Sequence, residues 1–135
     1  LASLKVMIML EQCDEFFTLV KKSVERDPWV EDRKLAGYCE EIVGEVNEMM
    51  QALQKKDYQN LKEELGDVLF DLAHVCFLAE KEGLFTMQDV FETINQKIKR
   101  RKPYLLAAEH QLITKEEARR IWLEVKEMEK KMKNV

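Results

Sequence analysis

Two pairs of acidic residues have the spacing that could support chemistry. Glu45 and Glu48 are three positions apart, and Glu64 and Asp67 repeat that spacing after residues 49–63. Residues three apart share one face of a helix. An ionised carboxylate among apolar neighbours is costly unless a cation compensates it. Several hard oxygen ligands without a histidine or cysteine pair select Mg²⁺ or Mn²⁺ rather than zinc, and such ions commonly serve phosphate chemistry.

The segment around the second pair is otherwise strongly apolar. Between Leu65 and Ala79 the polar side chains are only Asp67, Asp71 and His74. This leaves little room for a solvated face around Asp67, so a compensating cation is the favoured interpretation there. His74 is instead expected to be a hydrogen-bonded core or interface histidine. For Asp71 the sequence is intermediate between the two interpretations, compensation by a cation as for Asp67 and a role in the core as for His74.

The helix that precedes this segment contains Glu45 and Glu48 and should place them close to Glu64 and Asp67. Glu41, Glu45 and Glu48 follow one another at steps of four and three, along the edge of an apolar seam. A short turn near residues 55–57 predicts an antiparallel hairpin, which would gather four acids from two helices. The competing interpretation of the glutamates is that they are solvated or paired with Lys and Arg.

Helical periodicity dominates the rest of the chain, and no strand is expected. The predicted helices cover residues 3–26, 33–55, 58–83, about 87–102 and 115–133, with a loop around Trp29 and a linker at 104–113. Asp27-Pro28 should end the first helix, and Gly83 is well placed just beyond the third. Because the third helix is apolar nearly all round, we expect an all-α bundle of four to five helices that is completed by dimerisation.

Composition limits the classes of protein that the chain can belong to. Its 135 residues, 46% of them hydrophobic, favour one domain over residues 1–135 and exclude a wholly disordered chain. Only 4 Gly and 2 Pro argue against a sandwich or barrel. A net charge of −4 makes nucleic-acid binding an unfavoured role. The first residue is Leu, which is compatible with a segment of a longer parent chain.

The apolar start and the cysteines bear on location. Residues 4–10 are too short to span a bilayer and lack the pattern of a signal peptide, so no membrane partner is expected. Three cysteines, none close to another, indicate neither a disulfide framework nor a zinc knuckle. A reducing, cytoplasmic location is the simplest expectation.

A basic run covers residues 97–102, with five of its six positions Lys or Arg. Cations at a helix C-terminus complement the helix dipole and often have no further role. A nucleic-acid patch would need interleaved aromatic residues, which are absent here. The interpretation that we favour is that Lys97 and Arg101, one turn apart, hold phosphates near the acids.

The ordered set of these motifs resembles the MazG nucleoside triphosphate pyrophosphohydrolases. Their Glu-Glu-x-x-Glu…Glu-x-x-Asp signature is similar to Glu45–Glu48 followed by Glu64–Asp67. Pro28-Trp29, residues 80–85 and the basic run also occur in the order that the family shows. The resemblance covers about 110 residues. The resemblance implies a homodimer that hydrolyses a nucleoside triphosphate between the α- and β-phosphates. It implies Mg²⁺ ligation and catalysis by Glu45, Glu48, Glu64 and Asp67. It also implies substrate contacts by Trp29, Lys97, Arg100 and Arg101.

The chain departs from this family pattern in two places. Gly44 occupies the position of the first Glu, for which Glu41, one turn before Glu45, is a candidate replacement. Residues 30–35 differ from the usual sequence after the Trp, so the preferred base stays open. The alternatives are a relative of the dUTPases or the phosphoribosyl-ATP pyrophosphohydrolases, or a catalytically weak helical interaction module.

Overall fold

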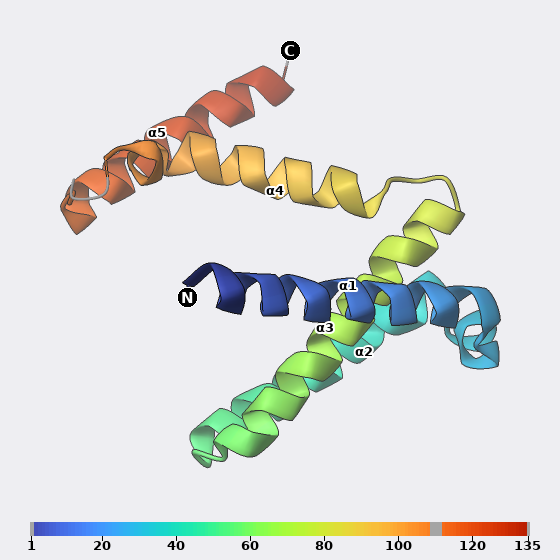
Figure 1. The fold of residues 1–135 in the computed structure, drawn as a ribbon. Helices are drawn as coiled ribbons and strands as arrows, with labels where there is room; N and C mark the ends of the chain where they lie inside the picture. Colours follow the sequence, from blue (N-terminus) through green and yellow to red (C-terminus); the bar gives the residue numbers. More distant parts are fainter. Residues whose placement is uncertain (1, 109–111, 135) are drawn as a thin grey trace. The chain divides into compact units, whose positions relative to one another are not determined.

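The computed structural model describes residues 2–108 and 112–134, and all of the regular structure in them is helical. This confirms the all-α fold class. The α-helices are α1 (Ala2–Arg26), α2 (Pro28–Gln54), α3 (Tyr58–Lys81), α4 (Met87–Arg101) and α5 (Lys115–Lys133), with a short 3₁₀ turn at Pro103–Leu106 (Figure 1). The chain forms two compact units, residues 1–87 and residues 88–135, which are described separately.

Helix α2 begins earlier than the sequence predicted. The loop expected around Trp29 is helical, because the Asp27 carboxylate accepts a hydrogen bond from the Trp29 N–H at 3.0 Å and Pro28 occupies the first turn. The helix is then interrupted at Lys34, whose backbone has φ 56° and ψ −176°. This kink lies close to the boundary that was predicted for the helix, at residue 33.

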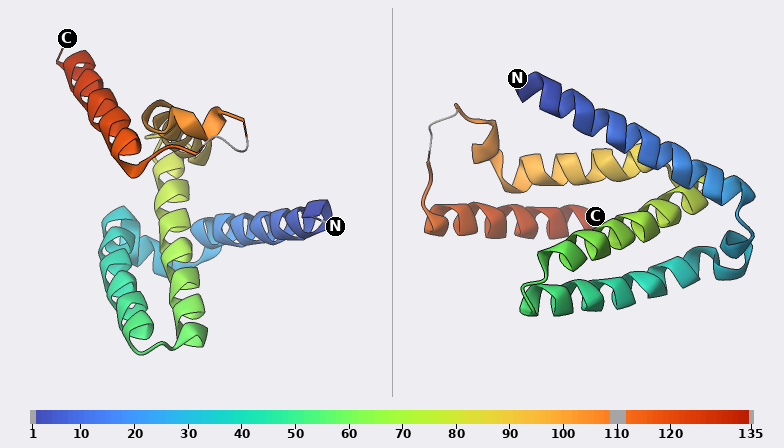
Figure 2. Two further views of the ribbon diagram at one scale, coloured as in Figure 1. Left: turned by 90° about the vertical axis from the view of Figure 1, so that its left-hand side faces the viewer. Right: turned by 60° about the horizontal axis from the view of Figure 1, so that its bottom comes forward.

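Helices α2 and α3 form the antiparallel hairpin that the sequence predicted (Figure 2). The turn between them uses a positive φ of 56° at Lys56. Asp57 then caps α3, its side chain accepting the Asn60 N–H at 3.1 Å. At the far end of α3, Gly83 has φ 74°, which confirms its predicted position just after the helix.

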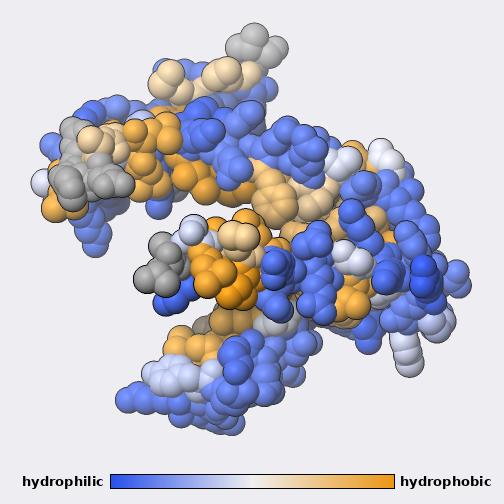
Figure 3. Space-filling model, viewed as in Figure 1, coloured by the Kyte–Doolittle hydropathy of each residue, from blue (hydrophilic) through white to orange (hydrophobic). Residues whose placement is uncertain are grey.

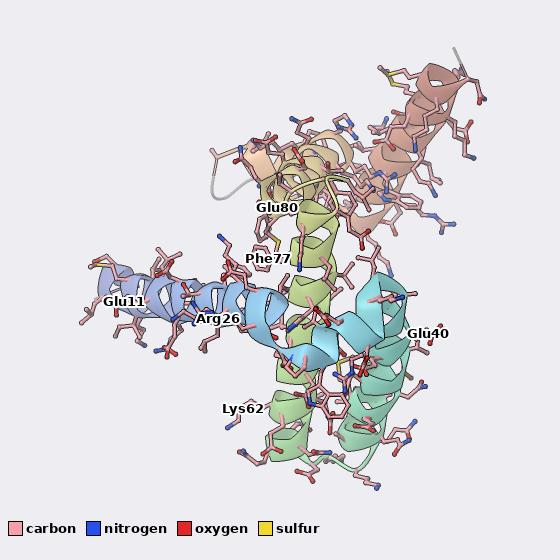
Figure 4. All side chains as sticks on the ribbon, turned by 90° about the vertical axis from the view of Figure 1, so that its right-hand side faces the viewer. Glu11, Arg26, Glu40, Lys62, Phe77 and Glu80 are labelled. Atoms are coloured by element: carbon pink, nitrogen blue, oxygen red, sulfur yellow. The ribbon has the colours of Figure 1, made fainter. Side chains whose placement is uncertain are left out.

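The core of the first unit lies where α1 crosses α3, with Phe77 labelled at that crossing in Figure 4. It contains seven buried residues from three helices: Val20, Val24, Val30, Tyr38, Ala73, Phe77 and Leu78. Only part of α1 contributes to this core. Val20 and Val24 are buried, whereas Leu4, Ile8 and Leu19 are at least half exposed, because only the second half of α1 reaches this core. Figure 3 shows hydrophobic residues on the molecular surface.

His74 is a buried, hydrogen-bonded core residue, as the sequence predicted. Its Nδ1 lies 2.8 Å from the Phe70 carbonyl oxygen and its Nε2 lies 2.8 Å from Ser23 Oγ. The carbonyl can only accept, so Nδ1 carries the proton and Nε2 accepts from the serine hydroxyl. Burial lowers the pKa of His74, which keeps the ring neutral. The imidazole therefore joins α1 to α3.

The second unit contains most of α4, the 3₁₀ turn and α5. Thr114 caps α5 by accepting the Glu117 N–H at 3.2 Å, a contact typical of a Thr-x-x-Glu helix start. The expected linker at 104–113 begins within the 3₁₀ turn, and its residues 109–111 lie outside the described residues. No helix among the described residues is long and apolar enough to cross a membrane.

Candidate metal centre

Three carboxylates converge between the two helices of the α2–α3 hairpin. One oxygen each from Glu45, Glu48 and Glu64 lies within 4.8 Å of the others. Glu45 Oε2 and Glu64 Oε2 are both buried, and neither has a hydrogen-bond partner. A buried carboxylate oxygen without a partner is costly, so a cation or a proton at this point would stabilise the arrangement.

The proximity of these acids changes their pKa values. Burial and the charge of Glu48 raise the pKa of Glu64 to about 7. Burial, followed by the charges of Asp67 and Glu48, also raises the pKa of Glu45. Both shifts reflect the cost of placing several negative charges together away from water. A divalent cation at this point would reverse both effects.

The acids line an open cleft of about 420 Å³ on the first unit. Asp67 lines this cleft beside Glu45 and Glu48, although it is outside the tight group of three. The remaining lining residues are Arg33, Glu41, Gly44, Phe70 and Asp71. Figure 4 marks the two helices of the hairpin by Glu40 on α2 and Lys62 on α3.

Arg33 and Glu41 form an ion pair at the edge of the cleft, with Arg33 Nε 3.0 Å from Glu41 Oε1. Glu41 thus lines the same cleft as Glu45, but it already has a cationic partner. Arg33 was not among the residues predicted from sequence. Helical spacing could not have found it, because the kink at Lys34 separates it from the part of α2 that carries Glu41.

Asp71 is more deeply buried than the other acids. It is 3% exposed, and its Oδ2 has no hydrogen-bond partner. Burial is the main reason that its pKa rises to about 6, and the charge of Glu41 adds to this, whereas Arg33 opposes it. The structure thus places Asp71 in the cleft with the metal-site candidates.

Trp29 lies in the first turn of α2 and is 63% exposed. The Arg33 guanidinium carbon lies 5.8 Å from the centre of the Trp29 ring and 5.7 Å from that of Tyr38. These distances are compatible with cation–π contacts. Trp29 therefore supports Arg33 and leaves much of its own surface free.

The three basic residues predicted to contact phosphate lie in the second unit. Arg100 Nε is 3.2 Å from Glu129 Oε1, and Arg101 Nη2 is 2.8 Å from Glu129 Oε2. Both arginines therefore already bind a carboxylate on α5, which lowers the pKa of Glu129. Within the described part of the chain, Lys97 forms no ion pair.

The donor set of the cleft fits a hard divalent cation. All of the candidate ligands are carboxylates, two of their buried oxygens lack partners, and their mutual repulsion would be relieved by positive charge. Oxygen-only ligands of this kind suit Mg²⁺ or Mn²⁺. Glu45, Glu48 and Glu64 are the residues best placed to hold it, with Asp67 beside them.

Comparison with known proteins gives a consistent result. Residues 33–106 match the model of the MazG nucleotide pyrophosphohydrolase domain. The nucleoside triphosphate pyrophosphohydrolase of Escherichia coli (strain K12) is 28% identical over 101 residues, which is 73% of this chain and 38% of the relative. The nucleoside triphosphate pyrophosphohydrolase/pyrophosphatase MazG of Thermotoga maritima is 38% identical over 64 residues, covering 47% of this chain and 25% of the relative.

A solved structure supports the fold. The crystal structure of a MazG-related protein from Thermotoga maritima superposes with a TM-score of 0.78 at 29% identity, covering 84% of this chain and 98% of that one. The chain spans well under half the length of the two curated relatives named above. The domain match includes Glu45, Glu48, Glu64 and Asp67 within its bounds. The chain therefore belongs to the MazG nucleotide pyrophosphohydrolase family.

Proposed function

We propose that this protein is a Mg²⁺-dependent nucleoside triphosphate pyrophosphohydrolase, for which Mn²⁺ can substitute. It cleaves its substrate between the α- and β-phosphates, releases a nucleoside monophosphate and pyrophosphate, and thereby removes unwanted nucleotides from the cellular pool. The observation that carries the proposal is the convergence of Glu45, Glu48 and Glu64 within 4.8 Å in a chain of the MazG family.

Glu45, Glu48, Glu64 and Asp67 would hold the cation. When bound, it supplies positive charge for the phosphate oxygens and makes nearby water more acidic. Glu45 Oε2, which has no partner in the fold, is our candidate to accept the proton of the attacking water. The water oxygen bonds to the α-phosphorus, and the bond to the oxygen bridging the α- and β-phosphates breaks. Pyrophosphate leaves with that oxygen.

Basic and aromatic residues complete the proposed substrate contacts. Lys97 has no ion pair among the described residues, so it is the readiest partner for a phosphate oxygen. Arg100 and Arg101 would have to share or leave Glu129 to bind the substrate. The exposed ring of Trp29 offers a surface for the nucleoside.

The direct test is incubation with each NTP and dNTP in Mg²⁺, with separation of the products. Monophosphate and pyrophosphate are the expected products, whereas diphosphate with orthophosphate would contradict the proposal. Activity confined to dUTP or to phosphoribosyl-ATP would instead identify the narrower relatives named above. Millimolar Mg²⁺ should also raise the melting temperature by binding the folded state. An interaction module would be indifferent to the ion.

Variants of the acids test the metal assignment. Glu48→Gln and Asp67→Asn keep the size of each side chain and remove its charge, so both should lose at least 100-fold in activity and most of the Mg²⁺-induced rise in melting temperature. Glu63→Gln is the matched control, because Glu63 is exposed on α3 and binds only Gln59 among the described side chains. Activity close to wild type in both cleft variants would overturn the assignment.

A further inference from the structure

The cleft continues beyond the proposed metal ligands. Glu41 lies one helical turn before Glu45 on α2, and Asp71 lies one turn after Asp67 on α3. Because the helices are antiparallel, both of these steps lead toward the same end of the cleft, about 6 Å from the acids. Arg33 and Phe70 line that end too. We call Arg33, Glu41, Phe70 and Asp71 the distal end of the cleft.

Asp71 gives the distal end an unused hydrogen-bond acceptor. The side chain is almost completely buried, lines the cleft, and has an Oδ2 atom with no partner. A buried acceptor in this state gains most from a ligand that supplies an N–H group. A ligand group that presents only a carbonyl oxygen to Asp71 would instead be repelled.

Arg33 gives the same end a set of fixed donors. Its Nε is engaged by Glu41 at 3.0 Å, and its guanidinium lies near the rings of Trp29 and Tyr38. These contacts hold the guanidinium in place while its side chain stays 39% exposed. The Tyr38 hydroxyl also interacts with the guanidinium, and the N–H groups that neither Glu41 nor Tyr38 engages are available to an acceptor on a ligand.

The distal end also has space and an apolar surface for a flat ring. A Cβ added at Gly44 would meet no atom within 4 Å, so the cleft wall is open beside the ion pair. Phe70 is 39% exposed and lines the cleft. Aromatic side chains of this kind stack with nucleobases.

From this combination we infer that the distal end selects the nucleobase, through Asp71 as acceptor and Arg33 as donor. A base with an exocyclic amino group beside a ring acceptor satisfies both residues, whereas uracil and thymine present a carbonyl to Asp71. Cytosine compared with uracil isolates this difference, because its N4 amino group donates where uracil has the O4 acceptor. The inference rests on the proposed function, because it assumes that the phosphates bind at the acids.

The experiment compares kcat/KM for CTP and UTP in Mg²⁺. The wild-type protein should prefer CTP by at least tenfold. Asp71→Asn keeps the shape of the side chain and adds an amide donor that can pair with O4 of uracil, so the ratio should fall at least fivefold. Arg33→Gln should also lower the ratio. The exposed residue Asp14 provides a matched control, and Asp14→Asn should leave the ratio unchanged.

Three outcomes would overturn the inference: equal use of CTP and UTP by the wild type, an unchanged ratio in Asp71→Asn, or loss of the Mg²⁺-induced rise in melting temperature in that variant. The last would identify Asp71 as a metal ligand instead.

Calorimetric measurement of CMP and UMP binding in Mg²⁺ tests base selection without requiring hydrolysis. A preference for CMP that disappears in Asp71→Asn would support base selection even if no triphosphate is cleaved, so the two proposals can fail separately.

Discussion

At the scale of single residues, the first unit holds acids in a state that costs stability. Glu45, Glu64 and Asp71 each have a buried carboxylate oxygen without a hydrogen-bond partner, and all three have raised pKa values. Carboxylates this close together would be more stable if separated or paired. Perturbed groups gathered in one cleft are typical of functional sites. The cost is therefore explained best by a ligand that the cleft binds.

This cost predicts an unusual pH dependence in the metal-free protein. Because the folded pKa of Glu64 is about 7, against an ordinary value of 4.5, the folded state keeps a proton that the unfolded state has lost between these values. The contribution of Glu64 to the free energy of unfolding should therefore fall as the pH rises from about 4.5 to 7. In EDTA, the melting temperature of Glu64→Gln should therefore fall less steeply with rising pH over this range than the melting temperature of the wild type.

The same variant separates the two roles of the residue. Glu64→Gln should be more stable than the wild type at pH 8 without metal, because the repulsion is removed, and less responsive to Mg²⁺. Glu63→Gln, one position away and exposed, serves as the control. A Glu64→Gln protein that is less stable than the wild type in EDTA at pH 8 would show that the carboxylate has a structural partner.

At the scale of elements, the kink in α2 is the least regular feature of the first unit. Lys34 adopts φ 56° and ψ −176°, a region of backbone space occupied mainly by glycine. The kink follows Arg33 directly and separates the first turns of α2 from the part that carries Glu41, Glu45 and Glu48. The bent backbone thus lies between the ion-paired arginine and the acids.

Replacing Lys34 with glycine should stabilise the fold. Glycine reaches this conformation without the steric cost that a Cβ imposes, so Lys34→Gly should raise the free energy of unfolding by about 1 kcal/mol. Urea denaturation measures the change. Lys22→Gly is the matched control: Lys22 lies in the interior of α1, and the same substitution there should lower stability by about 1 kcal/mol. A loss of stability in Lys34→Gly would indicate that the lysine side chain makes a net contribution to the fold.

At the scale of the whole molecule, much apolar surface is left uncovered. Leu65, Leu69 and Leu72 are each 45% or more exposed, and their spacing places them on one side of α3. An apolar stripe on a helix is usually buried against another element. This observation supports the expectation that a second subunit completes the bundle.

We therefore predict that the protein is a homodimer. Sedimentation equilibrium should give about twice the chain mass of 16.0 kDa. Leu69→Glu places a charge in the middle of the stripe and should shift the equilibrium toward the monomer, because a charge without a partner is costly to bury. Lys81→Glu, on the opposite side of α3 and also exposed, is the control for the added charge. A wild-type protein that sediments as a monomer at all concentrations would contradict the prediction.

The features that were predictable from sequence depend on short separations along the chain. The Thr114 cap, the Gly83 terminus and the α2–α3 hairpin all follow from residues a few positions apart. Helical spacing together with the predicted hairpin also indicated that Glu45, Glu48, Glu64 and Asp67 would gather. The structure brings the first three together, and Asp67 lines the same cleft. Helix periodicity determines which side chains share a face, so a single sequence contains this information.

Other features were decided only by the tertiary structure. The depth at which Asp71 is buried depends on how the helices of the first unit pack, and the pairing of Arg33 with Glu41 spans a kink that no glycine marks. Arg100 and Arg101 looked available for phosphate, yet both bind Glu129 on another helix. Burial and ion pairing are set by residues far apart in the chain, so they appear only once the helices are packed in three dimensions.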